Sequence, residues 1–299
     1  MRHLISVCDM KDKVEYLLDL ADKFKKGLIK GKPLKDKYMA MVFEKASTRT
    51  RVSFEVGMSQ LGGTPLYLSA QDLQLGRGEP IADTARTLSR YVDAIMIRAF
   101  RHQDVIELAE NASVPVINGL TDLEHPCQTL ADMQTIREYK GDFNRKLAFI
   151  GDGNNVCNSL ILISAILGMD IYVASPKGYE PNKMIVKKAE EIARGQSKIK
   201  VTNDPYEAVA GADVVYTDVW VSMGRENETE ERLKAFRPYQ VNKDLMGHAK
   251  ADAIFMHCLP AKRGQETTSD VIDGPNSVVW DQAENRLHAQ KAIMYWLIR

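Results

Sequence analysis

The stretch FEKASTRTR (residues 43–51) follows an apolar run, residues 38–43, that is typical of a short buried strand. By period, the residues after it, 52–61, fit a strand or a helix, and their length and the Gly62-Gly63 stop favour a helix. Arginine and hydroxyl side chains thus lie where a strand leads into a helix, whose N-terminus offers free N–H groups and partial positive charge. Guanidinium and hydroxyl groups add donors suited to phosphate. The stretch predicts an anion site, and a solvated basic turn is the alternative if the segment is taken alone.

Segments that favour strands alternate with segments that favour helices along the whole chain. We expect strands at residues 38–43, 65–68, 94–97, 115–117, 147–150, 171–174, 199–201, 213–217 and 253–256. We expect helices at residues 14–21, 52–61, 81–91, 104–111, 126–139, 156–167, 182–193 and 284–298, with Asp9 available as N-cap of the first. This alternation predicts an α/β fold with parallel sheets in two doubly wound halves.

Length and composition indicate a globular protein of two domains. The chain has 299 residues, enough for each of two domains to bury its own core. Lysine plus arginine equals aspartate plus glutamate, both 40, so no net charge favours nucleic acid or a membrane surface. The longest apolar run, residues 160–167, is too short to cross a bilayer.

The four cysteines are widely spaced and form no C-x-x-C pair. This spacing argues against a disulfide framework or a zinc ribbon and fits a reducing compartment, so we expect a cytoplasmic protein. Residues 1–13 contain no apolar core of the kind found in secretory signals, and we expect none.

Polar side chains follow many of the expected strands, where parallel sheets bind their ligands. These positions are residues 47–51, Arg98, His125, Asn155, Asp218, and His257 with Cys258. Each signal is weak alone, but together they predict one site. Because the chain lacks the G-x-x-x-x-G-K-[ST] loop, a small phosphate compound is favoured over a nucleoside triphosphate.

His125 precedes Pro126, a residue that suits the first turn of a helix. A histidine in isolation is more often structural than catalytic. At a helix N-terminus, however, the local dipole disfavours the imidazolium and leaves a neutral N–H that can polarise a carbonyl oxygen. Gln128, one turn into the helix, could hydrogen-bond an amide.

The turn Gly151-Asp152-Gly153 suggests a dinucleotide-binding protein as an alternative. The match is poor, because Val156 occupies the third glycine position and the next strand ends in Ala-Ser-Pro without an acid for a ribose. A nicotinamide-dependent dehydrogenase is therefore disfavoured. Asn154 and Asn155 could instead bind the carboxylate of an amino acid.

Asp218 and Cys258 each have an ordinary structural reading, as a helix cap and as a buried apolar filler. At strand ends in a ligand site, Asp218 also suits a substrate ammonium and Cys258 a substrate amine. A metal site built from His125, Cys127, His257 and Cys258 matches no familiar zinc spacing, and we expect none.

These motifs resemble those of the carbamoyltransferases, and within them the ornithine branch. Residues 47–51 (STRTR) resemble the carbamoyl phosphate signature, and residues 125–128 (HPCQ) the second phosphate-side motif. Asp218 with residues 222–224 (SMG) resembles the mobile ornithine-binding loop, and residues 257–260 (HCLP) the motif that contacts the side-chain amine. The resemblance covers essentially the whole chain, in the same order, and its last two motifs point to ornithine rather than aspartate.

The resemblance implies a carbamoyl phosphate-binding domain, residues 1–140, on which the C-terminal helix 284–299 packs back. It implies an L-ornithine-binding domain, residues 141–283, and bridging helices between the two. It also implies trimers, or multiples of trimers, in which a loop of one subunit completes its neighbour's site. Here that loop would carry Gln74, with Arg77 also typical of the ornithine branch.

The implied reaction converts carbamoyl phosphate and L-ornithine into L-citrulline and phosphate, in arginine metabolism and without a cofactor. The neutral δ-amine attacks the carbonyl carbon directly, and phosphate leaves. Carbamoyl phosphate would be bound by Ser47, Thr48, Arg49, Thr50, Gln74, Arg98, His125, Pro126, Cys127, Gln128 and Arg286. Ornithine would be bound by Asn155, Asp218, Ser222, Met223, Cys258 and Leu259, and the catalytic groups would be Arg98, His125 and Cys258.

Other acceptors within the family, namely putrescine, a modified ornithine or aspartate, remain alternatives. Putrescine lacks the α-carboxylate and α-ammonium, so it would leave Asp218 and Ser222 nothing to bind. Outside the transferases, a dinucleotide-dependent oxidoreductase and a catalytically inactive structural subunit are the competing hypotheses.

Overall fold

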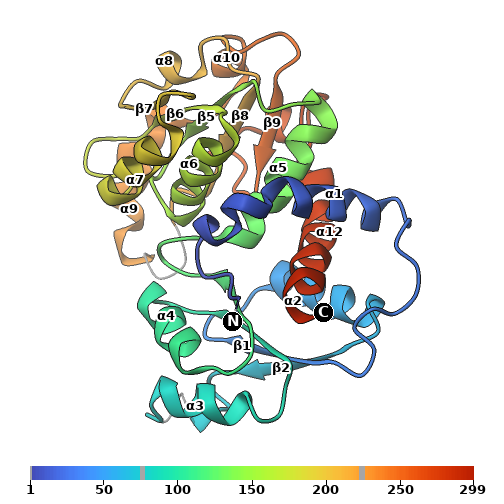
Figure 1. Ribbon diagram of the computed structural model, residues 1–299. Coiled ribbons are helices and arrows are strands. Elements are labelled where there is room, and N and C mark those ends of the chain that lie inside the picture. The colour runs from blue at the N-terminus through green and yellow to red at the C-terminus, as the bar shows by residue number, and fades with distance from the viewer. Residues whose placement is uncertain (1, 75–77, 222–225) are drawn as a thin grey trace. The chain divides into compact units, whose positions relative to one another are not determined.

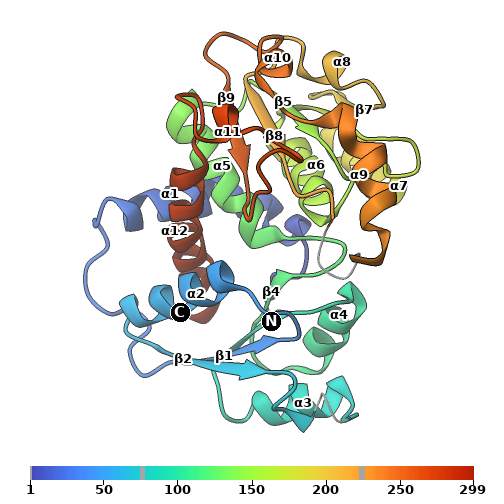
Figure 2. The same ribbon diagram turned by 180° about the vertical axis from the view of Figure 1, so that it is seen from behind.

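The computed structural model describes residues 2–74, 78–221 and 226–299, and the chain divides into two compact units (Figures 1 and 2). Unit 1 comprises Met1–Gln134 and Glu284–Arg299, and unit 2 comprises Thr135–Ala283. Two helices run from one unit into the other. Helix α5, Pro126–Lys140, begins in unit 1 and ends in unit 2, and α12, Val279–Ile298, does the reverse.

Unit 1 is built on a parallel sheet with strand order β2-β1-β3-β4. Its strands are β1 (Tyr38–Phe43), β2 (Thr64–Ser69), β3 (Ala94–Arg98) and β4 (Val116–Leu120). Its helices, besides the shared ones, are the 3-10 helix η1 (Val7–Lys13), α1 (Val14–Lys25), α2 (Thr48–Gln60), α3 (Ile81–Leu88) and α4 (His102–Asn111). Because the chain winds outward in both directions from β1 and β3, the switch point of the sheet lies between these strands.

Unit 2 repeats this principle with the strand order β7-β6-β5-β8-β9, again all parallel. The strands are β5 (Lys146–Ile150), β6 (Asp170–Ala174), β7 (Ile199–Thr202), β8 (Val214–Thr217) and β9 (Ile254–His257). The helices are α6 (Asn155–Leu167), α7 (Lys183–Ala193), α8 (Pro205–Val209), η3 (Glu226–Glu228), α9 (Thr229–Phe236), η4 (Arg237–Tyr239), α10 (Lys243–Met246) and α11 (Ser269–Ile272). The switch point here lies between β5 and β8. The predicted fold, two doubly wound parallel α/β parts, is confirmed.

The central strands are apolar because helices cover both faces of each sheet. β3 is buried along its whole length, and β1 is buried except at its first residue. Helix α6 shows the same effect, since it is mostly apolar and buried from Val156 to Ala165. It is capped at its start by the Asn154 side chain and ends at Gly168, whose φ of 71° is the left-handed conformation that suits glycine.

The segment that was ambiguous by period, residues 52–61, forms most of α2, so the helical reading is confirmed. Ser47 caps this helix, and its Oγ accepts a hydrogen bond from the Thr50 amide at 3.3 Å. Beyond its first turn the helix satisfies its own backbone donors, whereas the alternating pattern offered only a weak strand signal.

Several helix boundaries differ from the sequence prediction, and so does the cap expected for the first helix. Asp9 does not cap α1. It lies in the first turn of η1, where Ser6 is the N-cap and the Asp9 carboxylate accepts from the amides of Ile5 and Ser6. Helix α12 begins at Val279, earlier than predicted, and Val279 is buried whereas Trp280 is exposed.

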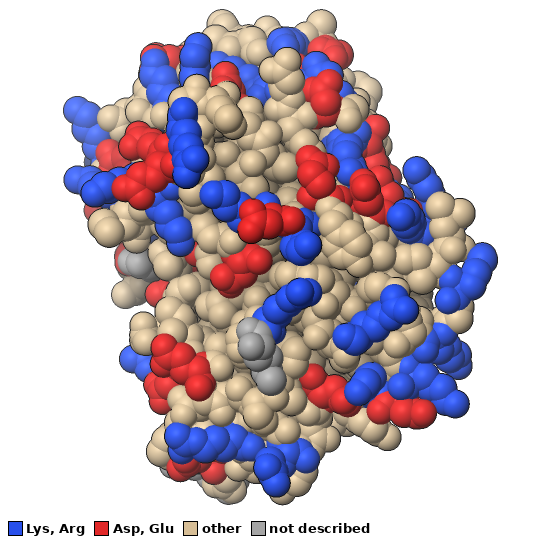
Figure 3. Space-filling model, viewed as in Figure 1, with Lys and Arg blue, Asp and Glu red and all other residues tan. Residues whose placement is uncertain are grey.

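Helix α12 also packs on α1 within unit 1. The rings of Phe24 and Tyr295 meet edge to face at 5.8 Å, and Lys25 Nζ donates to Asn285 Oδ1 at 2.8 Å. On the face shown in Figure 3, basic and acidic side chains are interspersed, as their equal numbers imply. Among the described residues, no helix is both long and apolar enough to span a bilayer.

Candidate active site

Two arginines of unit 1 meet at one hydroxyl group near the switch point of its sheet. Arg98 ends β3, and its Nη1 lies 3.5 Å from Oγ1 of Thr50, in the first turn of α2. Arg286 of α12 donates to the same oxygen from Nη2 at 3.3 Å. All three side chains are buried, so the sheet, α2 and α12 together hold cationic donors in a position where an anion would neutralise them.

Helix α5 adds an amide to this group. Gln128 Oε1 accepts from Arg286 Nη1 at 2.6 Å, and its Nε2 donates to Asp132 Oδ1 at 2.8 Å. Asp132 is buried and fixes which end of the amide faces the arginine. Asp132 was not predicted as a site residue, although a carboxylate one turn after a glutamine on a helix is a readable signal.

His125 lies directly before α5 and is buried beside the arginines. Burial, followed by the charges of Arg286, Arg98 and Arg49, holds the pKa of His125 well below its ordinary value. The imidazole is therefore neutral at physiological pH. The sequence argument reached a neutral ring through the helix dipole, whereas the largest cause in the structure is burial.

Most of the remaining predicted carbamoyl phosphate residues lie at the starts of α2 and α5. Ser47, Thr48 and Arg49 form the cap and first residues of α2, and Pro126 begins α5. Cys127 is buried, its Sγ donates to the Asn118 carbonyl at 3.4 Å, and burial raises the pKa of its thiol to about 12. Gln74 is exposed, and Arg77 lies outside the described residues.

In unit 2, side chains that follow three predicted strands are hydrogen-bonded to one another at Asp218. Asp218 follows β8, and its Oδ2 accepts from Asn154 Nδ2 at 2.7 Å while its Oδ1 accepts from the Cys258 thiol at 3.1 Å. Asn154 also caps α6 through its Oδ1, so it cannot turn away. Asn155 is the first residue of α6, and Leu259, after Cys258, has a left-handed φ of 60°. Ser222 and Met223 lie outside the described residues.

The turn that carries Asn154 explains its glycines. A Cβ at Gly153 would lie 2.2 Å from the Pro181 nitrogen and 2.3 Å from the Glu180 carbonyl carbon, so only glycine fits against that segment. Gly151 has a φ of 139°, which also favours glycine. The motif that suggested a dinucleotide thus serves close packing of the backbone.

Arg232, on α9, ties this turn to the segment after Asp218. Its Nη1 donates to Asp152 Oδ2 at 2.9 Å and to the Trp220 carbonyl at 3.0 Å, and its Nε donates to Glu228 at 2.8 Å. Arg232 is buried. Arg232 was not predicted as a site residue, because an i,i+4 acid–arginine pair is usually an exposed surface feature.

A second buried pair fixes the backbone on both sides of Cys258. His257 Nε2 lies 3.2 Å from Glu266 Oε1, both side chains are fully buried, and His257 Nδ1 accepts from the Leu259 amide. Asp218, His257 and Cys258 each offer a possible metal-ligand atom within 4.8 Å of the others, although their spacing along the chain gave no metal motif. Both ring nitrogens of His257 are already engaged, which weakens this set as a metal site.

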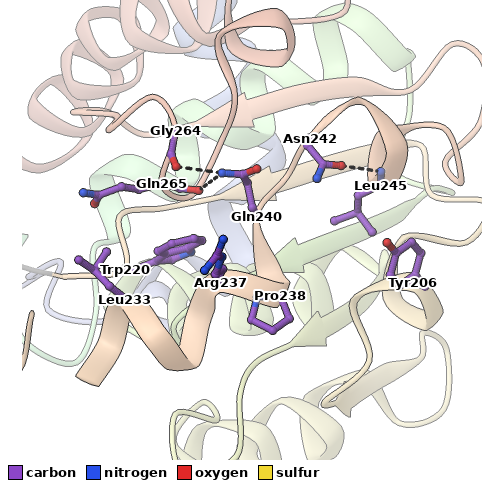
Figure 4. Close-up of a pocket in the computed structure, with 10 residues that line it drawn as sticks. All are labelled: Tyr206, Trp220, Leu233, Arg237, Pro238, Gln240, Asn242, Leu245, Gly264 and Gln265. Carbon is purple, nitrogen blue, oxygen red and sulfur yellow. Dashed lines mark hydrogen bonds between the residues drawn. The ribbon is translucent and has the colours of Figure 1, made fainter. Parts of the chain in front are cut away.

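A pocket of about 610 Å³ in unit 2 lies apart from the predicted residues (Figure 4). Its lining is Tyr206, Trp220, Leu233, Arg237, Pro238, Gln240, Asn242, Leu245, Gly264 and Gln265. Gln240 donates to the carbonyls of Gly264 and Gln265, and Asn242 caps α10, so several lining groups are occupied in holding the fold. We therefore do not take this pocket as the candidate site. The buried arginines around Thr50 and the groups around Asp218 do not line it, and such clusters of charged groups are more typical of active sites.

Fold and side chains define a two-unit α/β protein with an arginine-lined anion site in unit 1 and a carboxylate–amide–thiol cluster in unit 2. Residues 2–138 match the aspartate/ornithine carbamoyltransferase carbamoyl-P binding domain, and residues 144–297 match the Asp/Orn binding domain of the same family. The chain belongs to the aspartate/ornithine carbamoyltransferase family.

Its relatives share nearly the whole chain. It is 71% identical to an ornithine carbamoyltransferase of Methanothermobacter thermautotrophicus over 299 residues, which is 100% of this chain and 99% of that one. It is 60% identical to that of Methanosphaera stadtmanae, with 100% of both covered. The solved structure of ornithine carbamoyltransferase from Pyrococcus furiosus has a TM-score of 0.96 at 57% identity, covering 99% of this chain and 97% of that one.

Proposed function

We propose that the protein transfers the carbamoyl group of carbamoyl phosphate to the δ-amine of L-ornithine, giving L-citrulline and phosphate. The observation that carries this proposal is the convergence of Arg98, Arg286 and Gln128 around Thr50, beside a neutral His125. This combination suits a small molecule that carries both a phosphate and a carbonyl group. Relatives that span the whole chain and bear the name ornithine carbamoyltransferase support the same reaction.

In this proposal, unit 1 binds carbamoyl phosphate. Ser47, Thr48 and Arg49 at the start of α2, with Arg98 and Arg286, hold the phosphate. Thr50, Arg98 and His125 stabilise the oxyanion that develops on the carbonyl oxygen, each donor contributing about 3 kcal/mol. Gln128, which turns from its present partners to the substrate, holds the carbamoyl amide. Pro126 and Cys127 supply the backbone that places these side chains.

Unit 2 binds ornithine in this proposal. Asp218 pairs with the α-ammonium, and Asn155, Ser222 and Met223 hold the α-amino acid end. The Cys258 thiol and the Leu259 carbonyl orient the δ-amine. That amine must be neutral to attack, and its lone pair forms the new C–N bond to give a tetrahedral intermediate. The intermediate expels phosphate as the C–O bond breaks, and the proton lost from the amine nitrogen goes to the leaving phosphate. Simultaneous binding of the two substrates supplies a large part of the rate enhancement.

We assign residues 1–140, with the C-terminal helix, to carbamoyl phosphate binding and residues 141–283 to ornithine binding. We further propose a homotrimer, or a multiple of trimers, in which Gln74 completes the site of a neighbouring subunit. Val52 and Val56 of α2, with Leu66 and Tyr67 of the edge strand β2, are exposed apolar side chains of unit 1 that suit such an interface. Light scattering at several concentrations tests the assembly, and a stable monomer would contradict it.

The proposed setting is arginine biosynthesis in the cytoplasm. All four cysteines are free thiols, and Cys127 and Cys157 are buried. Thiols persist in reducing compartments, which supports this location. Cell fractionation with an antibody against the protein checks it.

Comparison of acceptors tests the proposed reaction most directly. Carbamoyl phosphate is supplied with ornithine, putrescine, N-acetylornithine or aspartate, and product and phosphate are measured together. We expect ornithine to give the largest kcat/KM, because it alone offers both an α-amino acid end and a free δ-amine. A preference for aspartate or putrescine would overturn the assignment, and no turnover with any acceptor would favour a structural subunit.

A further inference from the structure

Glu124, the residue before His125, is a buried carboxylate. Its side chain contacts a segment that we call the N-terminal arm, residues 3–13. Its Oε1 and Oε2 accept from the Ser6 hydroxyl at 2.8 and 3.1 Å, and Oε2 accepts from the Val7 amide at 2.7 Å. A buried carboxylate is costly unless such donors compensate it. Glu124 is therefore committed to holding the arm and the residues before α5 together.

The arm is attached to the same region by its backbone. Leu4 pairs in parallel with Ile117 of β4, and its N–H and C=O bond to Val116 O at 2.8 Å and Asn118 N at 2.7 Å (Figure 2). The Asn118 side chain donates to the Ile5 carbonyl at 2.8 Å. The arm thus adds a short extended segment beside β4, and Glu124 closes the other end of this attachment.

The residues between β4 and His125 are fixed through Thr121. Its N–H donates to the Glu124 carbonyl at 3.0 Å, and its Oγ1 accepts from the Glu124 amide at 3.2 Å. His102 Nδ1 lies 2.9 Å from the same hydroxyl. Thr121 sets the shape of this turn, but the side chain of Glu124 is what ties the turn to the arm.

We propose that Glu124 is a positioning residue for His125, acting through the N-terminal arm. This inference rests on the proposed function, in which the His125 imidazole donates to the carbamoyl oxygen. Because His125 is the next residue, a shift of the Glu124 backbone displaces the imidazole directly. A displacement of about 1 Å is enough to lower a rate by a factor of roughly 100.

The variant that tests this inference is Glu124→Gln. The amide keeps the size of the carboxyl group but loses its charge and one of its two acceptor oxygens. Its NH2 group therefore faces the buried Val7 N–H, with which it cannot bond, or the Ser6 hydroxyl, which must then turn to accept and loses a bond to a charged group. We expect kcat to fall by tenfold or more and the KM for carbamoyl phosphate to rise. The KM for ornithine should stay within about twofold, because ornithine is assigned to unit 2.

Asp93→Asn is the matched control. Asp93 is also a carboxylate of unit 1 that accepts from a backbone amide, Tyr38 N at 2.9 Å, and from a side chain, Lys37 Nζ at 2.8 Å. It lies at the amino ends of β1 and β3, opposite the candidate site. We expect kinetic constants like those of the wild type.

Ser6→Ala provides the second variant in case Glu124→Gln does not fold. It removes the Ser6 hydroxyl, which donates to Glu124 and also caps η1 by accepting from the Cys8 amide, and leaves the Val7 amide bonded to Glu124. We expect the same selective change at smaller size. Wild-type kinetics in the folded Glu124→Gln and Ser6→Ala variants, or an equal rise of both KM values, would overturn the positioning role. If the wild type forms no citrulline, the proposed function fails instead, so the two failures are distinguishable.

Discussion

Arg286 Nη1 donates to Gln128 Oε1 at 2.6 Å although 158 residues separate the two in the chain. Arg286 comes from the last helix and Gln128 from α5, and both are buried in unit 1. The contact places a cation from the end of the chain beside the side chains at the start of α2. The anion site of unit 1 is therefore complete only when the C-terminal helix α12 is in place.

Removal of the Arg286 guanidinium tests this dependence. We expect Arg286→Ala to raise the KM for carbamoyl phosphate by about 10- to 100-fold, because a hydrogen bond to a charged group contributes roughly 1.5–3 kcal/mol. Steady-state kinetics with both substrates varied gives this number. Lys291→Met is the control, since Lys291 is a cation of the same helix whose Nζ bonds to Gln60. A similar effect in both variants would mean that α12 matters only for folding.

The pH dependence of stability tests the neutral state of His125. Its folded-state pKa lies well below the ordinary value, chiefly through burial and then through the arginines. The unfolded chain therefore binds a proton near pH 6.5 that the folded protein does not, and the free energy of unfolding falls as the pH drops below about 6.5. We expect His125→Asn to remove this part of the acid sensitivity, measured as a smaller fall in Tm between about pH 7.5 and 5.

The control for that experiment is His248→Asn, which removes an exposed histidine. It should leave the fall in Tm on acidification as large as in the wild type. If His125→Asn were as acid-sensitive as the wild type, the imidazole would not be the buried neutral group described above.

Asp218 binds the α-ammonium of ornithine in our proposal. Of the two KM values, its loss should therefore raise only the one for ornithine. We expect Asp218→Ala to raise the ornithine KM by about 10- to 100-fold and to lower kcat, because an ion pair and the partners Asn154 and Cys258 are lost together. The KM for carbamoyl phosphate should change little. Asp252→Asn, which removes an exposed acid of unit 2, is the control. Unchanged ornithine constants in Asp218→Ala would remove its assigned role.

Arg232→Met should lower stability strongly. It leaves Asp152 and Glu228 without the guanidinium between them, and breaking a buried ion pair costs about 3–5 kcal/mol. Arg263→Met removes an exposed pair with Asp273 and should cost much less, because water and salt screen that pair. Urea unfolding measures both. Equal and small losses would show that the tie between the turn and the segment after Asp218 contributes little.

The local signals of the chain were sufficient for the architecture, and the roles that they assign to the site residues remain predictions. Strands that are apolar on both faces predicted covered parallel sheets, and β3 and β5 lie as expected. Ser47 at the start of α2 was visible as a cap before hydroxyl and arginine residues. The role predicted for Asp9 was wrong, because a polar residue caps a helix only where the chain turns into that helix. The chain turns into η1 at Ser6, and Asp9 lies inside η1.

The residues that support the site left no local signal. Glu124, Arg232 and Glu266 look like ordinary charged residues in polar segments, yet each is buried against partners far along the chain. Burial of a charged side chain is decided by what packs over it, and no window of sequence contains that information.

By itself, the sequence determined the alternation of strands and helices, the order of the motifs and the chemical types of the binding groups. These depend on periodicity, caps and side-chain chemistry, which act over a few residues. Only the tertiary structure decided that Arg98 and Arg286 share the Thr50 hydroxyl, that burial keeps His125 neutral, and that Asn154 and Cys258 both bond to Asp218. The physical reason is that hydrogen bonds and desolvation depend on distance in space, which the chain sets only when it is folded.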